Sequence, residues 1–318
     1  QGNAACHRFS SERSILVAVI SFLIWSVRAN LTPCWPCNGG CVMRTALLQL
    51  TSGDEPDRNL GHTLDKVREA AAAGAGFVLT PEVTNCVSTS RRQQQAVLQY
   101  EADDATLAAL CDLTATLHIW LLIGSLALKT DAADGRFANR SFLVAPDGSV
   151  HARYDKIHMF DVDVSAEETY RESDGFLPGK RAVTAQTPFG TLGMTICYDL
   201  RFPHLYRSLA VAGAEILTVP SAFSPVTGAA HWTALLQARA IETGCYVLAP
   251  AQSGTHSAKF GKPRKTFGHS MAISPWGEIL CDAGQEYPIV YVDLDLGQVS
   301  QARRRIPSLR HSCQFEGP

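Results

Sequence analysis

The sequence has no excess of charge of one sign and few long apolar runs. It carries 28 lysines and arginines against 30 aspartates and glutamates, a formal net charge of −2. Because nucleic-acid binding depends on a basic surface that displaces counterions, this balance argues against a nucleic-acid partner. Internal repeats and low-complexity stretches are also missing, while 46% of the residues are hydrophobic. These features exclude disordered, collagen-like and polytopic membrane proteins and favour a globular protein with a small-molecule partner.

The ten cysteines lack the spacing that is typical of a disulfide framework. Four of them lie before Met43 and the other six are scattered, which indicates a reducing, cytoplasmic compartment. Residues 34–41 contain a C-x2-C-x3-C pattern, but no histidine follows closely enough to suggest a zinc site. We therefore expect neither a metal nor a cofactor.

Residues 1–42 differ in character from the rest of the chain. Their apolar run, residues 14–27, is shorter than the roughly 20 residues of a membrane-spanning helix. A signal-peptide core is an alternative, although no small-residue cleavage site follows cleanly. The segment directly after Met43 is typical of a buried first strand. We expect residues 1–42 to lie outside the functional domain, with targeting or anchoring as the alternative, residues 43–307 to form the domain, and residues 308–318 to form a tail.

From Met43 onward, short apolar runs alternate with segments of helical periodicity. Two predicted strands at 45–50 and 76–80 flank an amphipathic helix at 59–73, whose apolar stripe includes Leu60 and Leu64; this β-α-β order favours parallel pairing. The same patterns predict helices at 105–116, 202–212 and 231–242, and strands at 119–128, 137–145, 149–154, 191–196, 216–219, 246–250, 269–274 and 289–294. No linker divides the region, so we expect one α/β domain with helices packed on a sheet or sheets.

Three chemically reactive side chains stand near the ends of predicted strands. Glu82 follows the apolar FVLTP, Lys156 ends the strand tail RYDK, and Cys197 lies between the strand GTLGMTI and the segment YDLRFP. Ligands commonly bind at the carboxyl ends of strands in α/β folds, so the three residues are candidates for one site. Taken singly, a cysteine is more often a buried apolar residue, and an acid or a base at a strand end is more often solvated.

Together, the three side chains meet the needs of acyl transfer. A thiol with the ordinary pKa of about 8.5 is mostly protonated at neutral pH, so it needs a base before it attacks. The tetrahedral intermediate needs a donor for its oxyanion. A carboxylate, an ammonium group and a thiol satisfy these demands without histidine or a metal ion.

The segments around these residues resemble the three signatures of the nitrilase superfamily of carbon–nitrogen hydrolases. The segments are TPE at Glu82, YDKIHMFD at Lys156 and CYDLRFP at Cys197, in that order. The resemblance extends over residues 43–307. Further segments are similar to the branch that contains the deaminated glutathione amidases and the omega-amidases: PSAFSPVTGAAHW, ARAIETGCYV and FGHSMAISPWG.

The resemblance implies an αββα sandwich in which Glu82 is the general base, Lys156 stabilises the oxyanion and Cys197 is the acylated nucleophile. Glu172 stands where the family carries a second structural or catalytic glutamate. The backbone N–H of Tyr198 is expected to complete the oxyanion hole. Because sandwiches of this family usually pair face to face, the resemblance also implies a homodimer or a larger homo-oligomer.

Other polar residues have two interpretations each. Arg201 is a candidate for binding a substrate carboxylate, with a local ion pair to Asp199 or another nearby acid as the alternative. His231 is a candidate for contacting the substrate, or it caps or packs at the start of a helix. The basic loop at residues 259–265 is either a solvated loop or a cationic lip that attracts an anionic substrate.

The leading functional hypothesis is a cytoplasmic amidase that hydrolyses a small carboxylated amide through a thioester. Deaminated glutathione is the expected substrate, and omega-amidase activity on α-keto acid amides is the alternative. Nitrile hydrolysis is disfavoured because Tyr198 and Asp199 stand where nitrilases proper carry tryptophan and glutamate. Membrane acyl transfer is disfavoured because it requires several membrane spans. A catalytically idle interaction protein is the third class, and the intact set of Glu82, Lys156 and Cys197 argues against it.

Overall fold

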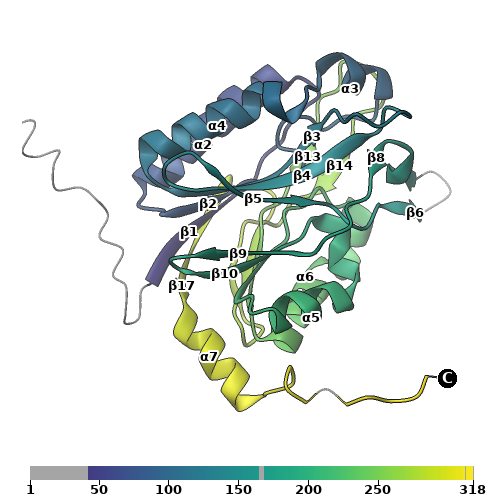
Figure 1. Ribbon diagram of the computed structural model, residues 1–318. Coiled ribbons are helices and arrows are strands. Elements are labelled where there is room, and N and C mark those ends of the chain that lie inside the picture. Colours follow the sequence, from purple (N-terminus) through teal and green to yellow (C-terminus); the bar gives the residue numbers. More distant parts are fainter. Residues whose placement is uncertain (1–41, 165–167, 312, 318) are drawn as a thin grey trace, which may run out of the picture. The chain divides into compact units, whose positions relative to one another are not determined.

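The computed structural model describes residues 42–164, 168–311 and 313–317. Within them, two β-sheets pack face to face between two layers of helices (Figure 1). This is the αββα sandwich that the resemblance implied. The expected extension at residues 1–42 lies outside the described part of the chain, apart from Val42, which opens the first strand. In the described part, no helix is both long and apolar enough to cross a membrane.

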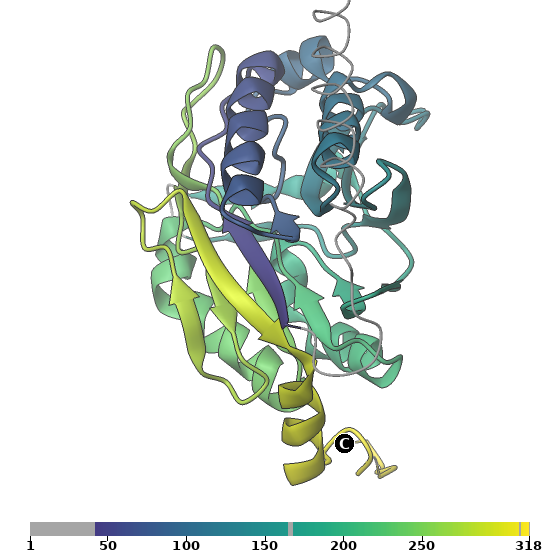
Figure 2. The ribbon, with the colours of Figure 1, turned by 90° about the vertical axis from the view of Figure 1, so that its left-hand side faces the viewer.

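The first sheet contains the predicted β-α-β unit. Strands β1, β2 and β3 are parallel, and helices α2 (Pro56–Ala72) and α4 (Ala105–Leu117) connect them and cover their outer face (Figure 1). The last strand of the chain pairs antiparallel with β1, and the two lie side by side in Figure 2. The order is β17 (Ile289–Asp295), β1 (Val42–Leu48), β2 (Phe77–Leu79), β3 (Trp120–Leu128), β4 (Phe137–Val144) and β5 (Val150–Asp155), with β8 (Phe176–Leu177) beside β4.

The second sheet is covered on its outer face by α5 (Pro203–Val211) and α6 (Pro225–Thr243) (Figure 1). Its order is β16 (Ile279–Asp282), β15 (Met271–Ile273), β12 (Tyr246–Ala249), β11 (Ile216–Thr218), β10 (Gly190–Met194) and β9 (Val183–Thr187). The remaining elements are α3 (Arg91–Val97), α7 (Leu296–Arg305), the ribbon of β6 (Asp161–Asp163) and β7 (Thr169–Arg171), the ribbon of β13 (Ser253–Thr255) and β14 (Lys265–Phe267), and three short 3₁₀ helices: η1 (Glu101–Asp103), η2 (Glu172–Asp174) and η3 (Cys197–Arg201).

The buried face of α2 differs from the predicted apolar stripe. Asn59 and Thr63 are buried together with Val67, whereas Leu60 and Leu64 are only partly buried. The amide of Asn59 is satisfied there, because it donates to the carbonyls of Gly53 and Asn85 at 2.9 and 2.8 Å. A buried amide is tolerated when its hydrogen bonds are made. The bond to Asn85 also connects α2 to the loop that follows β2.

One predicted helix boundary beside the second sheet is wrong. The helix expected to begin at His231 begins at Pro225 instead. Proline is favoured in the first turn of a helix, where its missing N–H has no partner to lose. His231 therefore lies within α6 and does not open it.

Candidate active site

Glu82 stands on a tight turn just after β2. The next residue, Val83, has a left-handed backbone with φ of 47°, which is rare for a β-branched residue. Its N–H donates to the Ser125 hydroxyl at 2.7 Å. A side chain at Gly124 would place its Cβ only 2.0 Å from the carbonyl oxygen of Thr80. Glycine is therefore required where β3 passes against the turn that carries Glu82.

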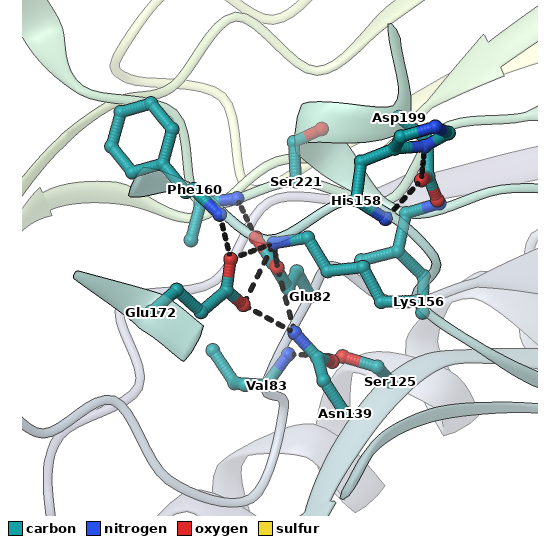
Figure 3. A network of polar contacts seen from close by, with 12 residues as sticks. Glu82, Val83, Ser125, Asn139, Lys156, His158, Phe160, Glu172, Asp199 and Ser221 are labelled. Carbon is teal, nitrogen blue, oxygen red and sulfur yellow. Dashed lines mark hydrogen bonds and ion pairs between the residues drawn. The ribbon is translucent and has the colours of Figure 1, made fainter. Parts of the chain in front are cut away.

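Lys156 follows β5 directly, and its side chain is 2% exposed. Its backbone N–H donates to the carbonyl of Asn139 at 3.0 Å. Its ammonium group donates to Glu82 Oε1 at 2.8 Å and to the two carboxylate oxygens of Glu172 at 2.9 and 2.8 Å (Figure 3). One buried cation thus lies between two carboxylates.

The two carboxylates are held by further donors. Asn139 Nδ2 donates to Oε1 of Glu82 at 2.9 Å and to Oε1 of Glu172 at 3.3 Å (Figure 3). The N–H of Ala222 donates to Glu82 Oε2 at 2.8 Å. The N–H of Phe160 donates to Glu172 Oε2 at 2.6 Å. Each glutamate therefore has one fixed orientation in a largely dehydrated site.

Cys197 lies where β10 gives way to the 3₁₀ helix η3. Its backbone is left-handed, with φ of 49°, and its N–H donates to the carbonyl of Pro220 at 3.0 Å. The residue is only 6% exposed. Strained backbone conformations persist only where the surrounding structure holds them in place, and they are common at functional sites.

The charges of the site depend on a balance between burial and ion pairing. Burial raises the pKa of Glu82, but the neighbouring Lys156 ammonium outweighs it, so the pKa of Glu82 lies below its ordinary value. Burial lowers the pKa of Lys156, but Glu172 and Glu82 together raise it above its ordinary value. Burial and then the Glu82 carboxylate raise the pKa of Cys197. At neutral pH the site therefore holds a carboxylate, an ammonium group and a protonated thiol.

This balance predicts the pH dependence of catalysis. The resemblance implies that Glu82 is the general base, which works only when ionised. Because the pKa of Glu82 is lowered, we expect the acidic loss of kcat/KM below the ordinary glutamate pKa of about 4.3. The raised pKa of Cys197 should leave no step near the ordinary thiol value of about 8.5. Initial rates measured across pH test both expectations. Rechecking the activity after return to neutral pH separates titration from unfolding. An ascending limb near pH 8.5 would contradict this charge assignment.

Glu82, Lys156, Glu172 and Cys197 line one cavity, which has a volume of about 460 Å³. That volume lies within the range of about 300–1,000 Å³ that is typical of small-molecule sites. Tyr198, the expected oxyanion-hole residue, is part of its wall. The wall also includes Val83, Cys86, Arg91, Asn139, Phe160, Tyr170, Arg171, Ala222, Phe223 and Arg264.

Asp199 is buried behind this cavity and connects two segments of the site. Its Oδ2 accepts hydrogen bonds from the Tyr154 hydroxyl at 2.7 Å and from the N–H of Ile196 at 2.9 Å. Its Oδ1 contacts the ring of His158 at 2.7 Å and accepts from the backbone N–H of His158 at 3.0 Å (Figure 3). Tyr154 and His158 flank Lys156, and Ile196 precedes Cys197. Asp199 therefore connects the Lys156 segment to the Cys197 turn.

Arg201 and His231 lie outside the lining of the cavity. They contact each other, with Arg201 Nη2 3.3 Å from His231 Nδ1. The Arg201 guanidinium also lies 5.9 Å from the centre of the Tyr198 ring. Among the described residues Arg201 forms no ion pair with Asp199, which binds Tyr154 and His158 instead, and none with another acid. The geometry does not place either residue against a substrate.

The basic loop at residues 259–265 contributes one residue to the cavity. Arg264 lines it, and Lys259, Lys262 and Lys265 do not. Of the two interpretations of this loop, the cationic lip is therefore limited to a single arginine. Within the part of the chain that the structure describes, no group of three or more histidine, cysteine or acidic side chains is arranged to hold a metal ion.

Several residues that hold the site carry no signal in the sequence patterns. Asn139 lies in β4, where Arg140 and Ser141 follow it directly, so the strand pattern does not distinguish it from its polar neighbours. Ala222 and Phe160 hold the two glutamates through their backbone N–H groups. A site contact made by a backbone N–H cannot be recognised from the side-chain pattern of the sequence.

Comparison with known proteins places the chain in a class of enzymes. The carbon–nitrogen hydrolase family model matches residues 44–304. Deaminated glutathione amidase of Yersinia enterocolitica is 38% identical over 268 residues, which are 84% of this chain and 92% of the relative. The Caenorhabditis elegans NitFhit structure superposes with a TM-score of 0.78 at 31% identity, covering 87% of this chain and 66% of that chain.

A third protein is a Nesterenkonia amidase of the nitrilase superfamily. It is 26% identical with a TM-score of 0.67, and 83% of this chain matches 94% of that one. In the structure of one variant, the acetamide moiety of fluoroacetamide is covalently added at the active-site cysteine of that amidase. The αββα sandwich and these matches define an enzyme of the nitrilase superfamily. The chain belongs to the carbon–nitrogen hydrolase family, and it is an amidase.

Proposed function

We propose that this amidase hydrolyses a small carboxylated amide through a thioester on Cys197, and that deaminated glutathione is its preferred substrate. The observation that carries the chemistry is the buried Glu82–Lys156–Glu172 cluster in one cavity with Cys197. The substrate follows from the relatives named deaminated glutathione amidase, which include the human protein at 35% identity.

In the proposed first half-reaction, the Cys197 sulfur attacks the amide carbonyl carbon while Glu82 takes the thiol proton. The Lys156 ammonium and the backbone N–H of Tyr198 donate to the oxyanion. Glu82 then delivers the proton to the nitrogen of the leaving group, the C–N bond breaks, and an amine departs. Proton transfer by a positioned group of this kind typically contributes about 10²–10⁴ in rate.

In the second half-reaction, Glu82 takes a proton from a water molecule as that water attacks the thioester carbonyl. The C–S bond breaks, the acid product leaves, and the sulfur regains a proton. Glu172 contributes by its charge: its carboxylate binds Lys156 at 2.8 Å and keeps that group protonated beside Glu82. Without Glu172, Glu82 would be the single counterion of a buried ammonium group.

A comparison of two keto-acid amides tests the substrate. Deaminated glutathione releases cysteinyl-glycine, whereas α-ketoglutaramate releases ammonia from the same acyl group. We expect kcat/KM for deaminated glutathione to be at least about tenfold higher, equal to about 1.4 kcal/mol of transition-state binding. Chromatography of the common keto-acid product measures both rates in one assay. The reverse ratio would make the enzyme an omega-amidase, and no activity on either would refute the proposed substrate class.

We also propose that the enzyme works as a homo-oligomer in the cytoplasm. The cysteines that the structure describes are free, which fits a reducing compartment. Exposed apolar side chains lie on the outer helices, with Val211 of α5 64% exposed and Ile241 of α6 57% exposed. An assembly that pairs these outer helices would bury both side chains. The molar mass in solution, measured by light scattering, tests the assembly, and a monomer at working concentration would refute it.

A further inference from the structure

We propose that Arg264 binds a carboxylate of the substrate at the end away from the scissile amide, and that it selects carboxylated over uncharged amides. This inference rests on the proposed amidase chemistry at Cys197. It names the protein group that recognises the substrate class, which the family match does not assign.

The first observation is the way Arg264 is held in the cavity wall. Its Nη2 donates to the carbonyl of Ala222 at 2.7 Å, and its guanidinium carbon lies 5.7 Å from the centre of the Tyr170 ring. Its own carbonyl accepts from the N–H of His256 at 2.8 Å. The loop backbone and one guanidinium nitrogen are therefore fixed before any ligand arrives.

The second observation is an unsatisfied donor. The Nε atom of Arg264 is buried and has no hydrogen-bond partner among the residues that the structure describes. Leaving a buried donor unpaired is unfavourable, more so when the group is charged. Arg264 therefore lines the cavity without a full set of partners, and a carboxylate there that binds the terminal nitrogens of the guanidinium would neutralise its charge.

The third observation is the pairing of the other cations around the cavity. Lys156 is shared by Glu82 and Glu172, and Arg171 pairs with Asp163 at 2.7 Å. No carboxylate of the described residues lies within ion-pair distance of Arg264. Arg91 also lacks an acidic partner there, but it donates to the carbonyls of Gly175 and Gly135.

The position of Arg264 suits a short substrate. Arg264 binds the carbonyl of Ala222, and the N–H of the same residue donates to Glu82 at 2.8 Å. Ala222 thus links the guanidinium to the proposed base, because it contacts both. A substrate whose amide and carboxylate are separated by a few carbons can therefore reach both groups. Arginine is also the side chain best suited to a planar carboxylate, because its fork of N–H donors matches the two oxygens.

The test compares two amides of equal length, glutaramate and pentanamide, which differ by a carboxylate in place of a methyl group. We expect wild-type enzyme to prefer glutaramate, and Arg264→Gln to lower kcat/KM for glutaramate by at least about tenfold while pentanamide changes by less than about threefold. Lys262→Gln is the matched control, because it removes a charge from the same loop outside the cavity lining. Arg264→Lys should restore part of the preference.

Two outcomes would overturn the inference. An equal loss on both amides would mean that Arg264 only positions Ala222 and Glu82, and an unchanged preference would mean that it does not meet the carboxylate. If the enzyme prefers glutaramate through Arg264 but ignores deaminated glutathione, the inference stands and the proposed substrate fails. If no amide is turned over, calorimetry of glutarate with Cys197→Ala protein, with and without Arg264→Gln, decides the question: equal affinities would refute it.

Discussion

Replacing Cys197 with alanine is expected to abolish amide hydrolysis while leaving the fold intact. The substitution removes the sulfur atom that forms the proposed acyl bond, and loss of a nucleophile typically costs several orders of magnitude in kcat, about 10⁴ or more. The side chain is small and 6% exposed, so a single sulfur atom is lost from the cavity wall. Far-UV circular dichroism and the melting temperature should match those of the wild type. Cys197→Ser should retain little activity.

The same prediction identifies the acylated residue. Mass spectrometry of a reaction with a slow substrate should find the acyl group on Cys197. Cys86 also lines the cavity, and burial raises the pKa of its thiol as it does that of Cys197. The proposed base Glu82 interacts with the Cys197 thiol and not with that of Cys86, so Cys86 should remain unmodified. Cys281→Ala is a suitable control, since Cys281 lies in β16 and should keep wild-type turnover. Full activity in Cys197→Ala, or acylation of Cys86, would refute the proposed mechanism.

Replacing Lys156 with methionine is expected to reduce both turnover and stability. The ammonium group is the proposed oxyanion donor, and losing one such donor typically lowers kcat by about 10²–10³. It is also the shared partner of Glu82 and Glu172, at 2.8 Å from each. Removing one member of a buried ionic group typically costs about 3–5 kcal/mol of unfolding free energy. Urea denaturation and single-turnover kinetics measure the two effects separately.

A double variant separates the catalytic role of Lys156 from its structural role. Lys156→Met together with Glu172→Gln leaves Glu82 as the buried charge of the cluster, so it should recover part of the stability that Lys156→Met loses. It should not recover kcat, because the oxyanion donor is still missing. Recovery of both would show that Lys156 acts only by holding the fold.

The strands and helices that the sequence predicted well are those with strong apolar patterns. The run at residues 119–128 became β3, which is buried along its whole length, and the strands predicted at 137–145 and 149–154 became β4 and β5. The elements that were missed are short, polar or at sheet edges, such as β9, β16, α3 and α7. Their sequences carry little apolar periodicity, because only one side of each is covered by the core.

The site was predictable to the extent that side-chain chemistry and motif order reveal it. Glu82, Lys156 and Cys197 were identified as candidates from their place at strand ends, and the structure brings them into one cavity with Glu172. Arg201 and His231 had suitable chemistry but lie outside the lining. Their exclusion depends on how η3 and α6 pack, and sequence spacing does not carry that information.

The sequence by itself determined the family, the sandwich and the reactive groups, because apolar periodicity and three ordered motifs are local properties of the chain. The tertiary structure alone decided the charge state of the site and which residue of the basic loop at 259–265 lines the cavity. Glu82 is ionised because Lys156, far away in the sequence, lies 2.8 Å from it in a buried site. Cys197 is protonated because burial and the Glu82 carboxylate raise the pKa of its thiol. Arg264, and none of the lysines of its loop, lines the cavity for a similar reason. Electrostatic interactions and burial depend on distances in space, which only the packing of remote segments sets.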